Sequence, residues 1–534
     1  MGRKKKDKPK VVDIDVNEIE GIIAATKLGP LTEEQHEKLL QTVRLLFQQI
    51  QSGKARPKDS AKLERVLKAL AKAKAEREGK VEAKTTPSED SSKGKKPGHG
   101  RNGAAKFAGA IKVKTSHPEL KKGDPCPSCP PGKTGKVYPT KKPNVLIRLV
   151  GMAPIQATIY EMENLRCNLC GASFTAPTPE GVGDKKYDES VAGMLAVLKY
   201  GSGMPRNRLA GIQGRLGIPL PQPTQWELLK AAADSLKLLL NELLRQAAQG
   251  DVLHNDDTSM KILSIERPED KSTRTGIFTS TVVSTSSADA PRIALFFTGW
   301  QHAGENLADV LKERREELAT PTRMGDAASR NRPKDEKGEP IPTDKANCLA
   351  HGRQYIVNVY ENFPDESLYF LDELSTVFLN EKTAKNQKLN PQKRLEFHQE
   401  HSGPVMDRLW KWMERQFEEK LVEPNSALGE AIKHLKKNWE PLTLFLRKPG
   451  APIENNIAER AMKKAVLNRK NAHFYRNQTG ADVGDLFMSL IHTCELNEVN
   501  PFDYLTQALR NAGKITAENA ADWMPWSYRA QLAS

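Results

Sequence analysis

The stretch DVLHNDDTSMKIL, residues 251–263, decides which fold and which chemistry the chain can have. Its apolar and polar residues roughly alternate, which predicts a β-strand carrying Asp256 and Asp257 near its carboxyl end. In an α/β sheet this end of a strand is rigid and faces the crevice in which ligands bind. Because Asp and Thr are also ordinary turn residues, the stretch by itself is equally compatible with a polar turn.

Later segments supply further elements and two more acids. The β-rich segments 274–286 and 292–300 predict a meander with the first strand, and 302–318 predicts a helix. Asp326 follows a short, weakly apolar strand, and Glu459 lies on a much later predicted helix. The order Asp, Asp, Glu on such elements indicates a catalytic core of the RNase H-like type.

Length and charge narrow the classes of protein. A chain of 534 residues is too long for one hydrophobic core, so three or more domains are expected. The net charge of +15 favours a polyanionic partner such as nucleic acid. No apolar run approaches the length of a membrane span, and no apolar segment follows the basic start MGRKKKDKPK. We therefore expect a cytoplasmic, nucleoid-associated protein without a membrane partner.

Four of the six cysteines form two Cys-x-x-Cys pairs, Cys126 with Cys129 and Cys167 with Cys170. A zinc ion needs four ligands at tetrahedral corners, and two such turns joined by a hairpin supply them. We predict one structural Zn²⁺ in a zinc ribbon; a redox role is the alternative for a single pair. The nearby Gly-Lys-Thr does not form a P-loop, because Pro127 stands where the first glycine is required.

A helix, a turn containing Gly217 and a second helix between 187 and 244 give a helix-turn-helix outline. Arg206, Arg208 and Arg215 would contact DNA phosphates there, although a plain helical spacer is the equal alternative. In the later segment 345–360, Cys348 and His351 could ligate a metal. No second pair lies near them in sequence, which favours a core cysteine and a histidine on the helix face.

We predict a multidomain α+β protein whose RNase H-like α/β core is interrupted by a long helical insertion. The predicted domains are a basic tail (1–30), a helical hairpin or coiled-coil-like arm (31–80), a basic linker (81–120), the zinc ribbon (121–180), a helix-turn-helix-like DNA-binding domain (181–248), the core in two parts (249–362 and 449–480), the helical insertion between them (363–448) and a C-terminal helical element (481–534).

Cleavage of a phosphodiester bond with strand transfer uses two Mg²⁺ ions about 4 Å apart. Magnesium takes hard oxygen ligands and keeps several waters, so two or three carboxylates suffice. Asp256 would bridge both ions, while Asp326 and Glu459 would each complete one. Basic residues on and after the helix of Glu459 would hold the DNA backbone, namely Arg460, Lys463, Lys464, Arg469 and Lys470.

Several collinear motifs resemble the insertion sequence 66 family of bacterial transposases. They are HNDDT, MGDAASRN, NCLAHGRQY, PIENNIAERAM, NRKNAHF, the paired Cys-x-x-Cys turns, and LNEVNPFDYLTQAL with MPW near the end. The resemblance runs from about residue 112 to the C-terminus. It implies a DDE transposase with an RNase H-like core that acts on the terminal repeats of a mobile element.

The same resemblance assigns site residues and partners. It places the family's first aspartate on Asp256, its second on Asp326 and its glutamate on Glu459, with Glu454 as the alternative third acid. The family's Asp-Glu-Thr is Asp-Asp-Thr here, a departure at Asp257 that leaves the first aspartate intact. Expected partners are double-stranded DNA, further copies of the chain, and two small accessory transposition proteins. The alternatives are a zinc-ribbon DNA-binding regulator without catalytic activity and a structure-selective nuclease.

Overall fold

The computed structural model describes most of the chain beyond residue 153. The described residues are Glu119, 121–125, 135–138, 154–166, 173–183, 185–266, 276–286, 290–335 and 337–533. The chain divides into two compact units, residues 1–148 and residues 149–534. The predicted basic tail, the helical arm, nearly all of the linker and all four cysteines of the predicted zinc ribbon (Cys126, Cys129, Cys167 and Cys170) lie outside the described residues.

Short antiparallel pairings flank both Cys-x-x-Cys segments. In the first unit, Pro125 pairs with Lys136, so the chain returns on itself around the first pair. In the second unit, β1 (Asn164–Arg166) pairs with β2 (Ser173–Thr175) around the second pair.

Helices form the beginning of the second unit beyond residue 188, as the sequence predicted. Asp188 caps the first of them by accepting a hydrogen bond from the Ser190 N–H. The helix Arg206–Arg215 has Leu216 as its C-cap, and Gly217 follows with φ of 74°, a conformation that glycine adopts without strain. The elements are α4 (Glu189–Ala196), the π-helix η2 (Val197–Gly201), α5 (Arg206–Arg215), α6 (Gln222–Ser235) and α7 (Lys237–Ala247).

A mixed five-stranded sheet follows, with the order β6-β5-β3-β7-β8. The predicted meander is confirmed, because β3 pairs antiparallel with β5 and β5 antiparallel with β6, while β7 and β8 add in parallel on the other side of β3. The sequence did not predict β8, whose four residues carry no clear apolar alternation. The strands are β3 (Val252–Met260), β5 (Ile277–Thr285), β6 (Ile293–Gly299), β7 (Thr322–Gly325) and β8 (Asp344–Asn347).

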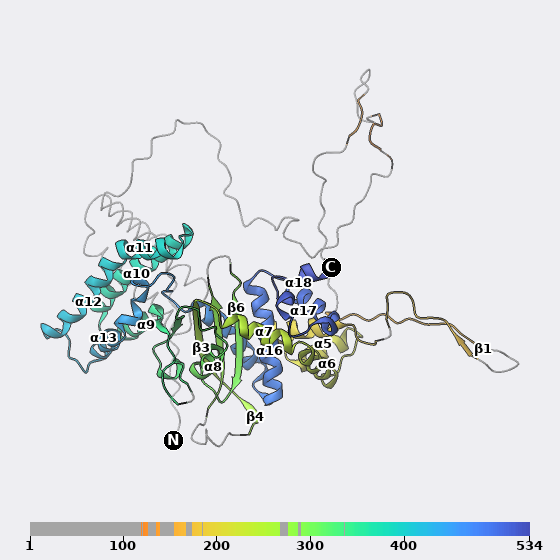
Figure 1. Cartoon of the computed structure of the whole chain (residues 1–534), viewed down its shortest axis with the longest axis horizontal. Coiled ribbons are helices and arrows are strands. Elements are labelled where there is room, and N and C mark those ends of the chain that lie inside the picture. Colours follow the sequence, from red (N-terminus) through yellow and green to blue (C-terminus); the bar gives the residue numbers. More distant parts are fainter. Residues whose placement is uncertain are drawn as a thin grey trace, which may run out of the picture. The chain divides into compact units, whose positions relative to one another are not determined.

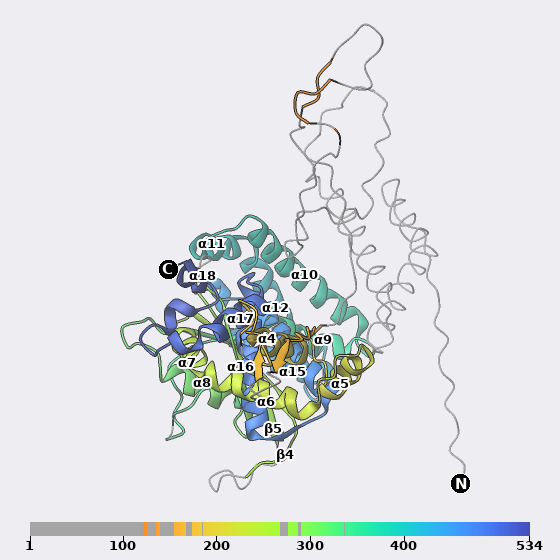
Figure 2. The same cartoon turned by 90° about the vertical axis from the view of Figure 1, so that its right-hand side faces the viewer.

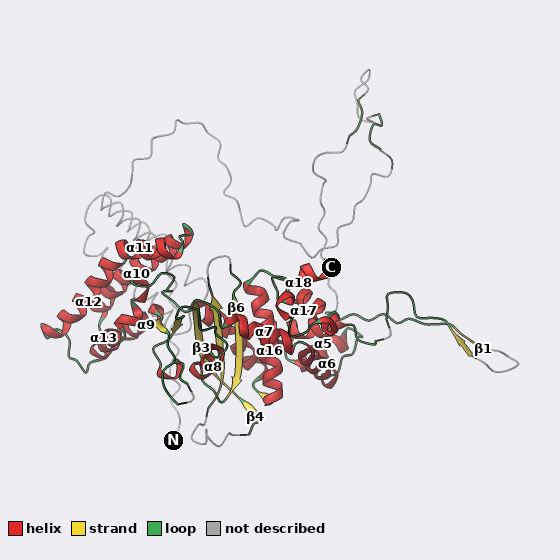
Figure 3. Ribbon diagram, in the orientation of Figure 1, coloured by secondary structure: helices red, strands yellow, loops and turns green. Residues whose placement is uncertain are grey.

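Helices cover both faces of this sheet (Figures 1 and 3). On one face Asp257 of β3 contacts His302 at the start of α8 (Ala303–Leu311). On the other face His254 contacts Asn455, immediately before α15 (Asn456–Ala472). The predicted helix 302–318 is too long, since α8 ends at Leu311. The guanidinium of Arg314 donates to the carbonyls of residues 248, 250 and 319, which holds the following turn in place.

The long helical segment predicted beyond residue 362 is present and has a hydrophobic cluster of its own (Figure 1). It packs against α9 (Leu349–Val359), the helix that follows β8. Its helices are α10 (Pro364–Asn386), α11 (Pro391–His401), α12 (Gly403–Glu418), α13 (Ala427–Lys437) and α14 (Trp439–Leu442), followed by the 3-10 turn η5 (Leu444–Leu446).

After α15, β9 (Tyr475–Asn477) pairs in parallel with β4 (Ile262–Ser264), and α16 (Gln478–Leu496) runs beside α15, as Figure 2 shows. The chain ends in short helices that pack on this layer, among them α17 (Pro501–Arg510) and α18 (Tyr528–Ala533). The 3-10 turns η6 (Ala512–Lys514) and η7 (Ala520–Trp523) lie between them.

Polar side chains of α16 accept hydrogen bonds from backbone N–H groups along the outer edge of β6. Four residues of a helix rise about 6 Å, and two residues of a strand rise about 6.6 Å, so every fourth side chain of α16 can meet every second N–H of β6. An uncovered edge strand would expose these N–H groups to a pairing partner. The bonds run from Thr298 N to Asp485 Oδ2 (2.6 Å), Phe296 N to Ser489 Oγ (3.0 Å) and Ala294 N to Thr493 Oγ1 (3.0 Å); beyond the end of both elements, Arg292 N donates to Asn497 Oδ1 (3.0 Å).

Replacing Ser489 by alanine tests this edge. The Ser489→Ala change leaves the buried Phe296 N–H without its acceptor, so we expect the free energy of unfolding in urea to fall by about 1–3 kcal/mol. The matched control is Ser375→Ala on α10, where an exposed hydroxyl donates only to the Asp372 carbonyl; there we expect a change within about 0.5 kcal/mol. Equal effects of the two changes would refute a stabilising role for the α16–β6 bonds.

Candidate active site

Asp256 lies on β3 two residues beyond the point at which β3 stops pairing with β7. One of its carboxylate oxygens accepts a hydrogen bond from the Asp257 N–H at 2.8 Å. Burial, together with the negative charges of Asp326 and Asp257, raises the pKa of Asp256 to about 6. The side chain is half-buried, and its surroundings disfavour the charged form of the carboxylate.

Asp326 follows β7 directly and faces the same region. Its Oδ1 accepts hydrogen bonds from the Ala328 N–H at 3.0 Å and from the side-chain amide of Asn331. Both bonds go to one oxygen and fix the carboxylate in orientation. The preceding Gly325 must lack a side chain, since a Cβ there would lie 2.7 Å from Asn255 Oδ1. This close approach brings the end of β7 beside β3.

Asp257 points to the opposite face of the sheet and is already paired. Its carboxylate, 2% exposed, lies 3.1 Å from His302 Nδ1 and 3.2 Å from Arg330 Nη2. His302 and Arg330, which come from separate segments, thus contact one carboxylate oxygen each. Of the two adjacent aspartates, Asp256 is thus the one whose carboxylate faces Asp326.

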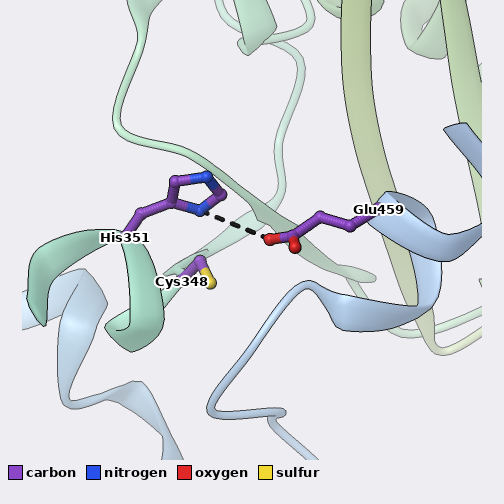
Figure 4. Close-up of side chains that lie close together, drawn as sticks. All are labelled: Cys348, His351 and Glu459. Atoms are coloured by element: carbon purple, nitrogen blue, oxygen red, sulfur yellow. Dashed lines mark ion pairs between the residues drawn. The ribbon is translucent and has the colours of Figure 1, made fainter. Parts of the chain in front are cut away.

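Glu459 lies in the first turn of α15 and approaches His351 of α9. Glu459 Oε1 is 3.7 Å from His351 Nδ1, and both side chains are partly exposed (Figure 4). A hydrogen bond with Cys348 raises the pKa of His351 to about 9, and electrostatic interactions with Cys348, Glu459 and Asp256 act in the same direction against the effect of burial. His351 therefore connects Glu459 with Asp256, since its imidazolium interacts with both carboxylates.

Asn455 holds the start of α15 against the sheet. Its Oδ1 lies 3.1 Å from His254 Nδ1, its Nδ2 donates to the Asn255 carbonyl at 3.0 Å, and its N–H donates to Cys348 Sγ at 3.3 Å. These buried bonds fix the position of Glu459, four residues later. The sequence analysis missed Asn455; the only local signal is a polar pair before a helix in PIENN.

Glu454, the alternative third acid, lies just before Asn455 and has another partner. Its carboxylate is 3.4 Å from Lys385 Nζ of α10, and Lys385 is also paired with Glu381 at 3.0 Å. Among the ion pairs of the part of the chain that the structure describes, Glu459 is thus joined to His351 and Glu454 to α10.

Cys348, His351 and Glu459 also form a group of possible metal ligands. One donor atom from each lies within 4.8 Å of the others. Cys348 is buried at the N-cap of α9 and His351 lies in the first turn of the same helix. From the sequence the pair was interpreted as a core cysteine and a histidine on the helix face, because no second pair of ligands lies near them in sequence; Glu459, which joins them, is more than a hundred residues away.

The basic residues predicted to contact DNA differ in their surroundings. Lys464 is paired with Glu495 at 2.6 Å, and Arg469 donates to Thr258 Oγ1 and Ser259 Oγ at 3.0 and 2.9 Å. Arg206 of α5 lies 5.1 Å from the Trp226 ring centroid. Exposed positions are occupied by Arg208, Arg215, Arg460, Lys463 and Lys470. Lys464, Arg469 and Arg206 therefore have intramolecular partners, whereas the five exposed residues face solvent.

Residues 185–483 match the family model described as Transposase IS66 family. The chain belongs to this family. It is a family of transposases, enzymes that bind and process DNA, which agrees with the resemblance seen in the motifs. No helix among the described residues is long and apolar enough to cross a membrane.

Three proteins of Sinorhizobium fredii are similar to the chain, and each is named only as uncharacterized. Protein y4hP is 24% identical over 395 residues, which cover 70% of this chain and 68% of that protein. Protein y4jD is 30% identical over 203 residues, covering 36% and 38%. Protein y4qI is 23% identical over 352 residues, covering 64% and 62%. Their names add no activity to the one that the family indicates.

Removing the Asp256 charge should stabilise the metal-free protein. The pKa of Asp256 is raised to about 6 from its ordinary value near 4, so ionisation costs stability, which falls as the pH rises from about 4 to about 6. We expect Asp256→Asn to gain about 1–2 kcal/mol above pH 6 in EDTA, after discounting for partial exposure, and nothing below pH 4.

Thermal melting across this pH range measures the gain. Mg²⁺ should then raise the melting temperature of the parent more than that of the variant, because the variant lacks a ligand. A stability loss at pH 7.5 in EDTA would contradict the unfavourable surroundings inferred for the charged form of Asp256.

Proposed function

We propose that the chain is a DDE transposase that cleaves at the ends of a mobile element and joins the freed 3′-ends to target DNA. The proposal is supported by electrostatic interactions that connect the three acids, which come from distant segments of the chain. Asp326 acts electrostatically on Asp256, and His351 interacts with both Asp256 and Glu459. Three carboxylates around one region are the ligand set that magnesium prefers.

The strand order supports an RNase H-like core. An antiparallel meander of three strands is extended beside its first strand by two parallel strands. Asp256 then lies on the central strand, and Asp326 lies at the carboxyl end of its parallel neighbour. Glu459 comes from a helix packed against the same strand, so the helical segment between β8 and α15 becomes an insertion within the core.

The carboxylates and their supports fit a pair of Mg²⁺ ions. When bound, the two ions would activate the attacking oxygen and stabilise the leaving oxygen of the phosphodiester. Asp256 would bind both ions, since it interacts with Asp326 directly and with Glu459 through His351. Asp326, with Oδ1 held by Ala328 and Asn331, keeps Oδ2 for a ligand role. Glu459, anchored through Asn455, would complete the second position.

Other parts of the chain would recognise and hold DNA. We propose a structural Zn²⁺ on Cys126, Cys129, Cys167 and Cys170, because two Cys-x-x-Cys pairs supply the four ligands that zinc needs. The α5–α6 pair is proposed as the helix-turn-helix-like unit, and its exposed Arg208 and Arg215 support that role. Terminal repeats and target DNA, further copies of the chain and two small accessory proteins are the proposed partners.

Substitution of each acid tests the assignment. Asp256→Asn, Asp326→Asn and Glu459→Gln should each lower Mg²⁺-dependent cleavage and joining by about a hundredfold or more, since even residues that only orient metal ligands contribute 10–100-fold. The assay uses labelled oligonucleotides that carry the element's ends, with Mg²⁺ or with EDTA. Gel-shift binding to the same oligonucleotides should be retained.

Glu454→Gln is the matched control and should keep most of the activity, because Glu454 pairs with Lys385 instead. Loss of activity in Glu454→Gln with full activity in Glu459→Gln would move the third acid to Glu454. Full activity in Asp256→Asn would overturn the proposal. Cleavage without joining would leave a structure-selective nuclease, and binding without any cleavage would leave a DNA-binding regulator.

A further inference from the structure

Three chemically different donors meet beside the proposed magnesium pocket. The thiol of Cys348, the imidazole of His351 and the carboxylate of Glu459 lie mutually within 4.8 Å (Figure 4). Magnesium has no preference for sulfur or for imidazole, whereas Zn²⁺ binds sulfur, nitrogen and oxygen ligands in one site. The donor set thus differs in kind from the all-carboxylate set of the proposed catalytic centre.

The geometry is close to what zinc requires. Tetrahedral bonds of about 2.0–2.3 Å place the ligand atoms about 3.5 Å apart. His351 Nδ1 and Glu459 Oε1 are already 3.7 Å apart, and the remaining separations are at most 4.8 Å. Small rotations of the two partly exposed side chains would close the difference. Cys348 and His351 are three residues apart at the start of α9 and so lie on one side of that helix.

The sulfur of Cys348 has a polar partner besides the other two members of the group. The N–H of Asn455 donates to Cys348 Sγ at 3.3 Å, and the sulfur sits at the N-terminus of α9, where the helix dipole favours negative charge. Such a second partner is typical of metal ligands. Burial of Cys348 shields the sulfur, while the exposed fractions of His351 and Glu459, 47% and 36%, leave an entry path.

We propose that Cys348, His351 and Glu459 bind a Zn²⁺ ion, with a water at the fourth position. This site is separate from the four cysteines of the proposed zinc ribbon. Zinc bound at this site would compete with the magnesium pocket for the carboxylate of Glu459. The site therefore inhibits catalysis, a consequence that rests on the proposed transposase function.

Cobalt titration of the metal-stripped full-length protein tests binding without relying on activity. Co²⁺ replaces Zn²⁺ and gives visible and thiolate charge-transfer absorption when a cysteine ligates it. The parent should bind about one more equivalent than Cys348→Ala, and the difference spectrum should contain a thiolate band. His351→Gln should lose the same equivalent, which guards against a folding defect peculiar to the cysteine variant.

Cys494→Ala is the matched control, because Cys494 is also a buried free cysteine and lies on α16 outside the cluster. Its cobalt stoichiometry and spectrum should equal those of the parent. An unchanged stoichiometry and spectrum in Cys348→Ala would overturn the site, whatever the enzyme does. The ribbon cysteines are present in every variant and cancel in the comparison.

A second arm tests inhibition. Zinc should inhibit Mg²⁺-dependent cleavage by the parent, excess Mg²⁺ should relieve it, and Cys348→Ala should need at least about tenfold more zinc, each variant being compared with its own zinc-free rate. Equal sensitivity of parent and variant would place the inhibition at the aspartates and overturn the regulatory role. If no protein cleaves DNA, the proposed function fails, while the cobalt arm still decides the site.

Discussion

The pleat of β3 is the constraint on which the site depends. Successive side chains of a strand point to opposite faces, so Asp256 and Asp257 cannot serve the same centre. Asp257 is held on the α8 side by His302 and Arg330, and this pairing fixes Asp256 toward α9 and α15. A shift of register by one residue would exchange the two aspartates and leave His302 and Arg330 facing the wrong one.

Buried hydrogen bonds of Asn455 hold the other segments of the candidate site against β3. Asn455 bonds to His254, to the Asn255 carbonyl and to Cys348, residues that are 201, 200 and 107 positions away in the chain. Every polar group of its side chain is thus committed to holding α15 against β3 and the start of α9. Because buried polar groups without partners are costly, these bonds also specify one arrangement of the three segments.

Sequence patterns predicted those parts of the fold that depend on residues close together in the chain. Period-2 alternation gave β3, β5 and β6, and the acids Asp256, Asp326 and Glu459 were chosen by their order on such elements. The four-residue β8, the acceptors of α16 that cover β6 and the contacts of Lys464 depend instead on segments far apart in sequence. No periodicity reports a hydrogen bond between Lys464 and Gly201, so only the tertiary arrangement distinguishes this lysine from an exposed one.

The position of Glu459 also bears on how one carboxylate could take part in both of the proposed metal sites. It lies in the first turn of α15, beside the sulfur and imidazole of α9, and the imidazole of His351 also interacts electrostatically with Asp256. Magnesium sheds its water reluctantly and accepts an incomplete set of protein ligands, whereas zinc gains most from the thiolate and imidazole that magnesium ignores. The proposed sites therefore need no rigid geometry to discriminate between the two ions. Carboxylates as the other ligands of Glu459 favour magnesium, whereas the thiolate and imidazole favour zinc.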